Sequence, residues 1–253
     1  MHLFRYAVPS LLILSLLISC GPRSTSQKTN IILFVVDDLG WIDPGFMGNT
    51  YNATPNIDRI AKEGIQFTNA YANAPNCAPT RACLLSGQYS PRHGVYTVGS
   101  PERGKSIYRK IIPSKNTTVL ARDNMTIGEV LQRNGYVTAH FGKWHLGDGD
   151  TGPLGRGFDY NFGGNKMGHP KSYFSPYHNK KLKDGPDGGY RTDRVAQEAA
   201  QFIGQKKDSA CFIDFPFYNV HTPWQGKQGL IEKYTEKPCD REKCNPTYAA
   251  MLE

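Results

Sequence analysis

Cys77 and the ten residues after it are the part of this chain whose types and spacing best suit catalysis. Pro79 is compatible with the first turn of a helix, and Gly87 is compatible with its end. Cys77 would then lie at the helix N-terminus, where unpaired N–H groups and the helix dipole favour negative charge. Arg81 would follow one turn later on the same face. We therefore expect a nucleophile beside a positive charge, which suits a tetrahedral oxyanion. A buried cysteine that begins a surface helix is the alternative.

Two adjacent carboxylates, Asp37 and Asp38, follow an apolar run over residues 30–36 that is rich in β-branched side chains. This run is typical of a buried strand in a parallel sheet. Ligands of open α/β sheets bind beyond the carboxyl ends of the strands. Paired carboxylates there need a positive partner, and oxygen ligands favour Ca²⁺, with Mg²⁺ as the second choice. An Asp-rich turn without a metal is the alternative.

Further polar residues follow two other predicted strands. Lys143 and His145 come after a strand over residues 136–141, and His221 comes after a strand over residues 211–215. The carboxyl ends of parallel strands meet at one edge of a sheet, so we expect these side chains near the two aspartates. Taken singly, the Lys-Trp-His turn and the loop histidine are also compatible with purely structural roles.

Strands and helices alternate along the chain, which predicts an α/β fold with a mainly parallel central sheet flanked by helices. Thr54 is expected to cap a helix, and Thr126 and Glu129 form a capping box. The other expected elements are a helix to Gly64, a strand over 65–71 that leads to Cys77, a short helix to Gly135, a helix over 193–205, a strand end at Pro216, and long loops over 98–124 and 148–189.

The N-terminus has the features of an export signal. A charged start and a short apolar core over residues 1–20 predict a signal peptide, because the apolar core is shorter than the roughly 20 residues that a membrane-spanning helix needs. It ends in a lipobox-like run at Cys20, which predicts a lipid anchor to the membrane, followed by a polar tether over residues 21–28. We expect an exported protein of a bacterial periplasm or outer-membrane surface. A cleaved signal without lipid is the alternative.

The charge pattern gives no indication of nucleic-acid binding, and the cysteine content agrees with an exported protein. The formal net charge is +8, but the basic residues are spread along the chain, and no helix has a dense basic stripe that would indicate nucleic-acid binding. Cys239 and Cys244 could close a small disulfide loop outside the cytoplasm. Cys83 and Cys211 lie in apolar runs and are expected to be buried thiols.

Several of these motifs together resemble the type I sulfatases. The run Cys-Ala-Pro-Thr-Arg from Cys77, closed by Ser86 and Gly87, resembles the Cys-x-Pro-x-Arg signature, with Ser86 where Thr is usual. The resemblance extends through Gly-Lys-Trp-His to a His-x-Pro segment. It implies an alkaline phosphatase-like sandwich over residues 29–253 and the hydrolysis of aryl or carbohydrate sulfates. It also implies that a formylglycine-generating or anaerobic sulfatase-maturing enzyme converts Cys77 to formylglycine.

The resemblance assigns roles to the site residues in two groups. The metal ligands are Asp37, Asp38 and residue 77, once it is converted and hydrated. The catalytic group consists of Cys77 as nucleophile, Arg81 holding the hydrate, Lys143 on the sulfate, His145 in contact with the formylglycine, and His221 at the sulfate and the leaving-group oxygen. On chemical grounds we expect His145 to be the base that allows sulfate release and His221 to protonate the leaving alcohol. Positioned cations would neutralise the anionic ester, as they do in phosphoryl transfer.

The pattern also departs from that family. In that family a Ser-Asp-Asn-Gly run supplies a second pair of metal ligands and is followed by a further lysine, and no such run occurs in this sequence. We therefore expect a domain that is incomplete at its C-terminus, with weak metal binding and slow or no turnover. Two alternatives remain: a phosphodiesterase or phosphonate monoester hydrolase of the same superfamily, and an inactive lipoprotein that binds sulfated glycans.

Overall fold

The computed structural model describes residues 28–239 and 243–253. The predicted signal peptide, Cys20 and all but the last residue of the polar tether lie outside the described residues. Within the described residues, no helix has the length and apolar character needed to cross a membrane.

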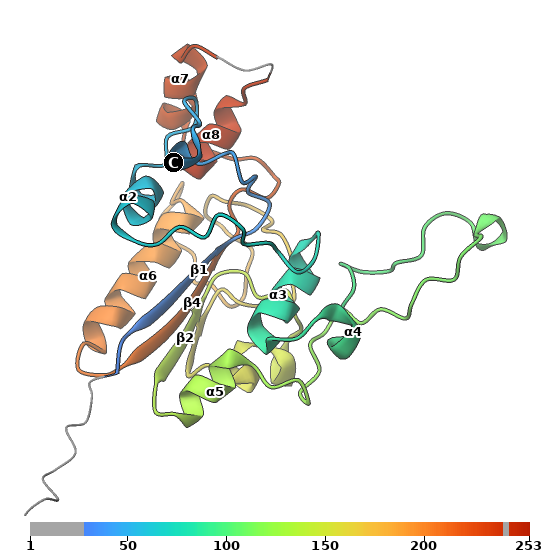
Figure 1. Cartoon of the computed structure of the whole chain (residues 1–253). Helices are drawn as coiled ribbons and strands as arrows, with labels where there is room; N and C mark the ends of the chain where they lie inside the picture. The colour runs from blue at the N-terminus through green and yellow to red at the C-terminus, as the bar shows by residue number, and fades with distance from the viewer. Residues whose placement is uncertain (1–27, 240–242) are drawn as a thin grey trace, which may run out of the picture.

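The centre of the molecule is a four-stranded sheet in which every paired strand is parallel. The strands lie in the order β1 (Ile31–Val36), β4 (Cys211–Phe217), β2 (Val137–Phe141) and β3 (Tyr160–Phe162) (Figure 1). Ile213 of β4 lies opposite Ile32 on one side and Ala139 on the other. The expected α/β fold with a parallel sheet is confirmed.

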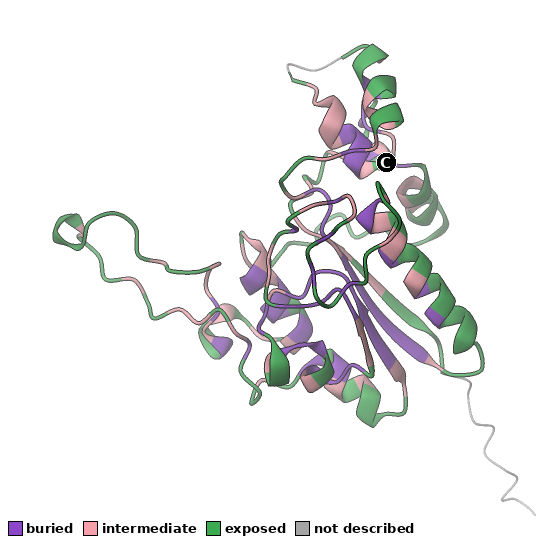
Figure 2. Ribbon diagram, turned by 180° about the vertical axis from the view of Figure 1, so that it is seen from behind, coloured by how far each residue is buried: buried purple, intermediate pink, exposed green. Residues whose placement is uncertain are grey.

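Helices cover both faces of the sheet. The long helix α6 (Arg191–Gln205) lies on one face, and α3 (Cys77–Ser86) and α5 (Ile127–Arg133) lie on the other, as Figures 1 and 2 show from opposite sides. Neighbouring residues of β4 serve different layers, because side chains alternate across a strand. Ile213 packs in the layer under α6, whereas Phe212 packs in the layer under α3.

Each layer has its own apolar core. The α6 layer contains Ala139, Phe141, Phe162, Val195, Ala199, Phe202, Ile213 and Phe215. The α3 layer contains Ala78, Ala82, Leu85, Leu120, Trp144, Leu146, Phe158 and Phe212. Fully burying one such large side chain contributes about 1.5–3 kcal/mol, so these layers hold the strands that carry the polar loops.

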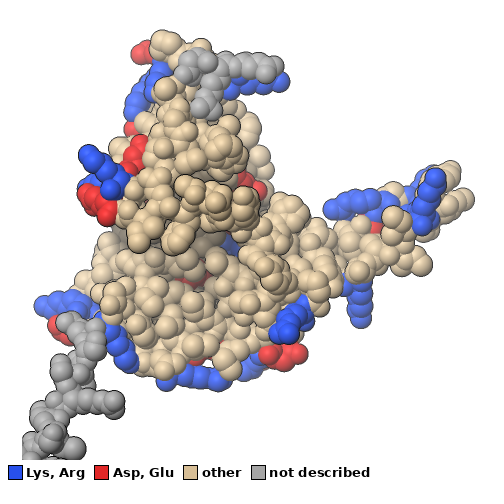
Figure 3. Space-filling view, in the orientation of Figure 1, with Lys and Arg blue, Asp and Glu red and all other residues tan. Residues whose placement is uncertain are grey.

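Four smaller helices complete the described part of the fold. They are α2 (Pro55–Glu63), α4 (Ser90–His93), α7 (Gln228–Glu236) and α8 (Pro246–Leu252), with 3-10 turns at Gly45–Met47, Ser106–Tyr108, Gly149–Thr151 and Pro153–Arg156. The first part of the expected excursion over residues 98–124 projects from the body as an arm, on which Figure 3 shows Lys and Arg side chains, whereas its last part returns to the body, where Leu120 is fully buried.

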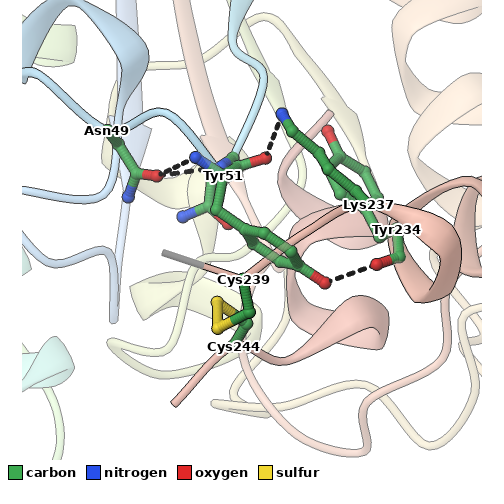
Figure 4. The surroundings of a disulfide bond; sticks show 7 residues. Asn49, Tyr51, Tyr234, Lys237, Cys239 and Cys244 are labelled. Atoms are coloured by element: carbon green, nitrogen blue, oxygen red, sulfur yellow. Dashed lines mark hydrogen bonds between the residues drawn. A yellow bond between two sulfur atoms is a disulfide. The ribbon is translucent and has the colours of Figure 1, made fainter. Parts of the chain in front are cut away.

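A disulfide joins Cys239 to Cys244 in the connection between α7 and α8, as the sequence suggested. The connection is tied to the body through Tyr51, whose hydroxyl donates to the Tyr234 carbonyl at 2.6 Å and whose carbonyl accepts from Lys237 at 2.8 Å (Figure 4). Cys83 and Cys211 are free, buried thiols, which confirms that prediction.

Local sequence signals located most helices correctly. Thr126 and Glu129 form both hydrogen bonds of the capping box at the start of α5. Gly87 ends α3 in the left-handed conformation, with φ of 64°, as expected for a C-terminal glycine. Thr54 lies at the N-cap of α2, but its hydroxyl donates to Asp58 in place of capping the helix N–H groups.

The expected strand over residues 65–71 is wrong. These residues form no strand with any described part of the chain, and the side chains of Ile65, Phe67 and Tyr71 are exposed. An alternating pattern forms a strand only where a neighbouring strand pairs with its backbone, and a lone extended segment has none.

Three other expectations about strands need correction. β1 is half exposed where a buried strand was expected, because it lies at the edge of the sheet and α6 covers β2 and β4 instead. β4 was expected to end at Pro216 but continues through it. Pro216 lies beyond the last residue that pairs with β2, so no hydrogen bond to β2 is lost through its lack of an N–H group. The expected loop over 148–189 contains β3, a strand too short to give a periodic signal.

Candidate active site

Three charged side chains from separate segments meet at the carboxyl edge of the sheet. Asp37 follows β1, Lys143 follows β2, and Arg81 lies on α3. The Asp37 Oδ2 atom is 2.9 Å from Lys143 Nζ and 3.8 Å from Arg81 Nη1. The side chains are 8%, 0% and 2% exposed, so the cluster is almost removed from solvent.

Arg81 is held in place by the turn that follows β2. Its Nε donates to the Trp144 carbonyl at 2.8 Å, and its Nη2 donates to the Lys143 carbonyl. Trp144 is fully buried and donates its ring N–H to the Thr151 carbonyl at 2.9 Å. These bonds join α3 to the turn, so the two cations are positioned together.

The turn itself has an unusual backbone. Gly142 has φ of 115°, and a Cβ there would lie 2.1 Å from the Pro216 carbonyl oxygen, so only glycine fits. Lys143 N–H donates to that same oxygen at 3.0 Å. His145 has φ of 62°, which is rare for a residue with a side chain and is found often at functional sites.

The electrostatics of the cluster favour an anionic ligand. Burial alone would raise the pKa of Asp37, but the charges of Arg81 and Lys143 outweigh it and hold the pKa below its usual range. Burial first, and then the charges of Lys143 and Arg81, lower the pKa of His145 to about 4. At neutral pH the buried cluster therefore holds two cations, one carboxylate and a neutral imidazole, a net charge of +1 that does not include the adjacent, exposed Asp38.

Several polar atoms of this cluster lack a hydrogen-bond partner. Asp37 Oδ2, Arg81 Nη1, Lys143 Nζ and His145 Nδ1 are all buried without one among the described residues. The short Lys143–Asp37 contact is thus an ion pair without hydrogen-bond geometry. Buried polar atoms are almost always paired in native proteins, so unpaired donors gathered in one place indicate a ligand site.

Cys77 and His221 lie at the border of this cluster. Cys77 is the first residue of α3, half buried, and one turn before Arg81, as expected. His221 follows β4 and is close enough to His145 for its charge to influence the pKa of that ring. Its Nδ1 donates to the Thr222 carbonyl at 2.8 Å, which leaves Nε2 as the ring nitrogen able to exchange a proton.

Asp37 and Asp38 have the oxygen atoms that a divalent metal prefers, but two carboxylates are too few to hold one. Asp38 is adjacent to Asp37 and has φ of 62°. Asp37 Oδ2 is a buried oxygen without a hydrogen-bond partner, the kind of hard donor that Ca²⁺ or Mg²⁺ prefers. However, the described residues contain no group of three or more His, Cys, Asp or Glu side chains arranged to hold a metal ion.

Two features near the site were missed in the sequence. His169 stacks on His221, with ring centroids 5.8 Å apart. His140 and Asp214 form a fully buried pair across the sheet, 2.8 Å apart, beside the Trp144 ring. The sequence does show that a histidine and an aspartate interrupt two apolar strands. It does not show that these two residues, 74 positions apart, pair with each other.

Comparison with known proteins gives a consistent result. The family model described as Sulfatase matches residues 29–252. N-acetylgalactosamine-6-sulfatase of Homo sapiens is 38% identical over 167 residues, which cover 66% of this chain and 30% of that protein. A protein named Sulfatase from Formosa agariphila is 32% identical over 286 residues, covering 91% of this chain and 52% of its own length. The chain therefore spans about half or less of these relatives.

Solved structures agree with the fold. The crystal structure of Ps i-CgsB in complex with k-i-k-neocarrahexaose has a TM-score of 0.68 and 32% identity, covering 89% of this chain and 52% of that one. The structure of BT4656 in complex with its substrate D-glucosamine-2-N,6-O-disulfate has a TM-score of 0.62 and 27% identity, covering 83% of this chain and 38% of that one.

Proposed function

The chain belongs to the sulfatase family, and from this premise we propose that it is a sulfuric ester hydrolase acting on sulfate monoesters of aryl or carbohydrate alcohols. The observation that carries the proposal is the buried cluster of Arg81, Lys143 and Asp37, whose unpaired polar atoms and net positive charge suit a sulfate group.

Sulfatases generally use a metal ion and a formylglycine residue. We infer that a maturation enzyme converts Cys77 to formylglycine. Asp37, Asp38 and residue 77 would contribute oxygen ligands to Ca²⁺ or Mg²⁺, with further ligands needed to complete the usual six to eight for calcium. The metal would neutralise charge on a sulfate oxygen, and the formylglycine would supply the hydroxyl that attacks sulfur.

Arg81 and Lys143 lower the repulsion between that hydroxyl and the anionic ester. A cation about 4 Å from a sulfate oxygen contributes about 4 kcal/mol at an effective dielectric constant near 20. Because Arg81 is fixed by two backbone carbonyls, it needs little reorganisation when charge develops.

The two histidines suit opposite proton transfers. The pKa of His145 is lowered to about 4, so its ring is neutral at neutral pH and can accept a proton from residue 77 when sulfate is released. The Nδ1–H of His221 donates to the Thr222 carbonyl, so the proton given to the leaving oxygen would be one bound at Nε2, and the ring must be protonated there before it can act as the donor.

We infer that the natural substrate is a sulfated glycan, because one structural relative is bound to k-i-k-neocarrahexaose and another to its substrate D-glucosamine-2-N,6-O-disulfate. We also propose export and a lipid anchor on Cys20. Labelling with a fatty acid in a bacterial host tests the anchor: wild type should be labelled and Cys20→Ala should not. Equal labelling of both would refute it.

The reaction is tested by comparing matched esters. The full chain, produced together with a formylglycine-generating enzyme, should hydrolyse 4-nitrophenyl sulfate with a higher kcat/KM than 4-nitrophenyl phosphate, bis(4-nitrophenyl) phosphate or a phosphonate monoester. Preference for a phosphorus ester would favour the related phosphohydrolase activity. Binding of sulfated glycans without any hydrolysis, unchanged in Cys77→Ala, would favour a binding protein.

A further inference from the structure

A loop connects the two histidines of the site. The Asn165 carbonyl accepts from His145 N–H at 3.0 Å, and Gly168 lies so close to the His145 ring that a Cβ would be 2.2 Å from it. One residue later, the His169 ring stacks on His221 at 5.8 Å, with 17° between the planes. Residues 165–169 therefore border the active site from one histidine to the other.

Buried asparagines hold this loop in one conformation. The Asn165 side chain donates to Asn179 at 2.8 Å and accepts from Met167 N–H at 2.7 Å. Asn179 in turn donates to the Gly163 carbonyl at 2.8 Å, and both asparagines are at least nine-tenths buried. The Gly163 N–H donates to the Lys181 carbonyl at 2.7 Å, so the segments 163–171 and 179–183 lie side by side.

These two segments are strongly basic. Between Asp159 and Asp184 the chain has five lysines and two histidines and no carboxylate side chain. The lysines are exposed, and within the described residues none of their ammonium groups forms a hydrogen bond or an ion pair; they are Lys166, Lys171, Lys180, Lys181 and Lys183. We call these five lysines, with His169, the basic rim.

Isolated surface lysines are usually solvated and without a role. The basic rim differs in two respects. Lys166, Lys171 and His169 belong to the fixed loop that contacts both site histidines, the other three lysines belong to the segment paired with that loop, and residues 160–183 contain no carboxylate that would neutralise them. Arg81 and Lys143 already face the single charge of the scissile sulfate, so the additional cations are free to bind a second anionic group.

We propose that the basic rim binds a second anionic group of the substrate, a sulfate or carboxylate on the same glycan, while the scissile sulfate occupies the Arg81–Lys143 cluster. The preferred substrate is therefore a glycan with more than one anionic group. This inference rests on the proposed hydrolase function and adds the substrate class to it. His169, stacked on His221, contacts the sugar between the two anionic groups.

The test compares one variant on two substrates. Lys166→Ala/Lys171→Ala should lower kcat/KM for a multiply sulfated carrageenan hexasaccharide or heparin tetrasaccharide by about five- to thirtyfold, the range expected for two partly exposed ion pairs. The same variant should change kcat/KM for 4-nitrophenyl sulfate by less than about twofold. The loss on the oligosaccharide should shrink at high salt, because exposed charges are screened.

Lys206→Ala/Lys207→Ala is the matched control, since these exposed lysines precede β4 at the opposite end of the sheet. It should leave both substrates unchanged. An equal loss on the oligosaccharide and on the aryl ester, or a loss matched by the control variant, would overturn the proposal of a second anion site.

Direct binding separates this inference from the hydrolase activity. With unconverted Cys77, calorimetry should detect binding of the same oligosaccharides to the full chain, weakened in Lys166→Ala/Lys171→Ala but not in the control. If the wild type fails to bind them, or all variants bind equally, the basic rim has no such role. If binding follows the prediction and no sulfate ester is hydrolysed, the proposed reaction fails and the anion site remains.

Discussion

Replacing Asp37 by Asn should destabilise the protein strongly, because it leaves two buried cations without their carboxylate. At an effective dielectric constant near 20, the 2.9 Å contact with Lys143 corresponds to a gross attraction of about 6 kcal/mol, and the 3.8 Å contact with Arg81 to about 4 kcal/mol. Desolvation opposes much of this. Breaking a buried ion pair from one side typically costs about 3–5 kcal/mol, and we expect Asp37→Asn to fall in that range.

Replacing Lys143 should cost much less. Lys143→Met removes one buried cation and leaves Asp37 paired with Arg81, whose Nε and Nη2 keep their carbonyl partners. We expect a loss of at most about 1.5 kcal/mol. The double variant has one cation and no carboxylate, hence the same net charge as wild type, and should be about 2 kcal/mol more stable than Asp37→Asn alone.

Urea unfolding followed by circular dichroism, in the presence of a chelator, measures these differences. Asp208→Asn is the matched control, because Asp208 is exposed and has no ion pair among the described residues. A loss below about 1 kcal/mol for Asp37→Asn, or simple additivity in the double variant, would refute the description of the cluster as one coupled charge group.

Three further predictions concern stability. Burial and the two adjacent cations lower the pKa of His145 to about 4, so the stability contributed by its neutral ring is complete above the unfolded pKa near 6.5 and is lost as the pH falls towards 4. The free energy of unfolding of the wild type should therefore fall over this window, and His145→Gln should reduce that fall by about 1–2 kcal/mol after allowance for solvent screening. An unchanged pH profile in the variant would contradict this. Asp214→Ala leaves the fully buried His140 ring without its 2.8 Å partner and should lower the free energy of unfolding by about 2–4 kcal/mol in the same urea assay, whereas a neutral effect would mean that the pair is not stabilising. Closing a six-residue loop with the Cys239–Cys244 disulfide contributes about 2 kcal/mol, so replacing both cysteines by Ser should lower the melting temperature by a few degrees, and no change would show that the loop is already ordered without the bond.

The parts of the fold that depend on short-range signals could be predicted from the sequence. The capping box at Thr126 and Glu129 and the C-terminal glycine at Gly87 act within one helical turn, so neighbouring residues contain all the information they need. The apolar runs of β1, β2 and β4 indicated parallel strands for the same reason.

The predictions that were wrong are those that depend on which strands become neighbours in the sheet. Residues 65–71 alternate like a strand but find no partner among the described strands, and β1 is apolar although it lies at a sheet edge. Pro216 lies inside β4 because the β2 ladder has already ended at Asp214. None of these facts is present in the residues of a single segment.

The site divides in the same way. The order of residues placed Asp37, Lys143 and His221 at one edge of a sheet, and β1, β2 and β4 do end there. The direct pairing of Asp37 with Lys143, separated by 106 residues, depends on side-chain packing and was not foreseen. The contact between His169 and His221 depends on a loop conformation set by Asn165 and Asn179, which no sequence period indicates.

The central claim is that residue 77, once converted, performs sulfate ester hydrolysis beside the Arg81–Lys143 cluster. The most direct measurement is the fraction of formylglycine at position 77, by peptide mass spectrometry, in preparations made with increasing amounts of maturation enzyme, set against the rate of 4-nitrophenyl sulfate hydrolysis. The account predicts a rate proportional to that fraction, with none for Cys77→Ala. Hydrolysis that is independent of the conversion, or a fully converted protein that hydrolyses no sulfate ester, would contradict it.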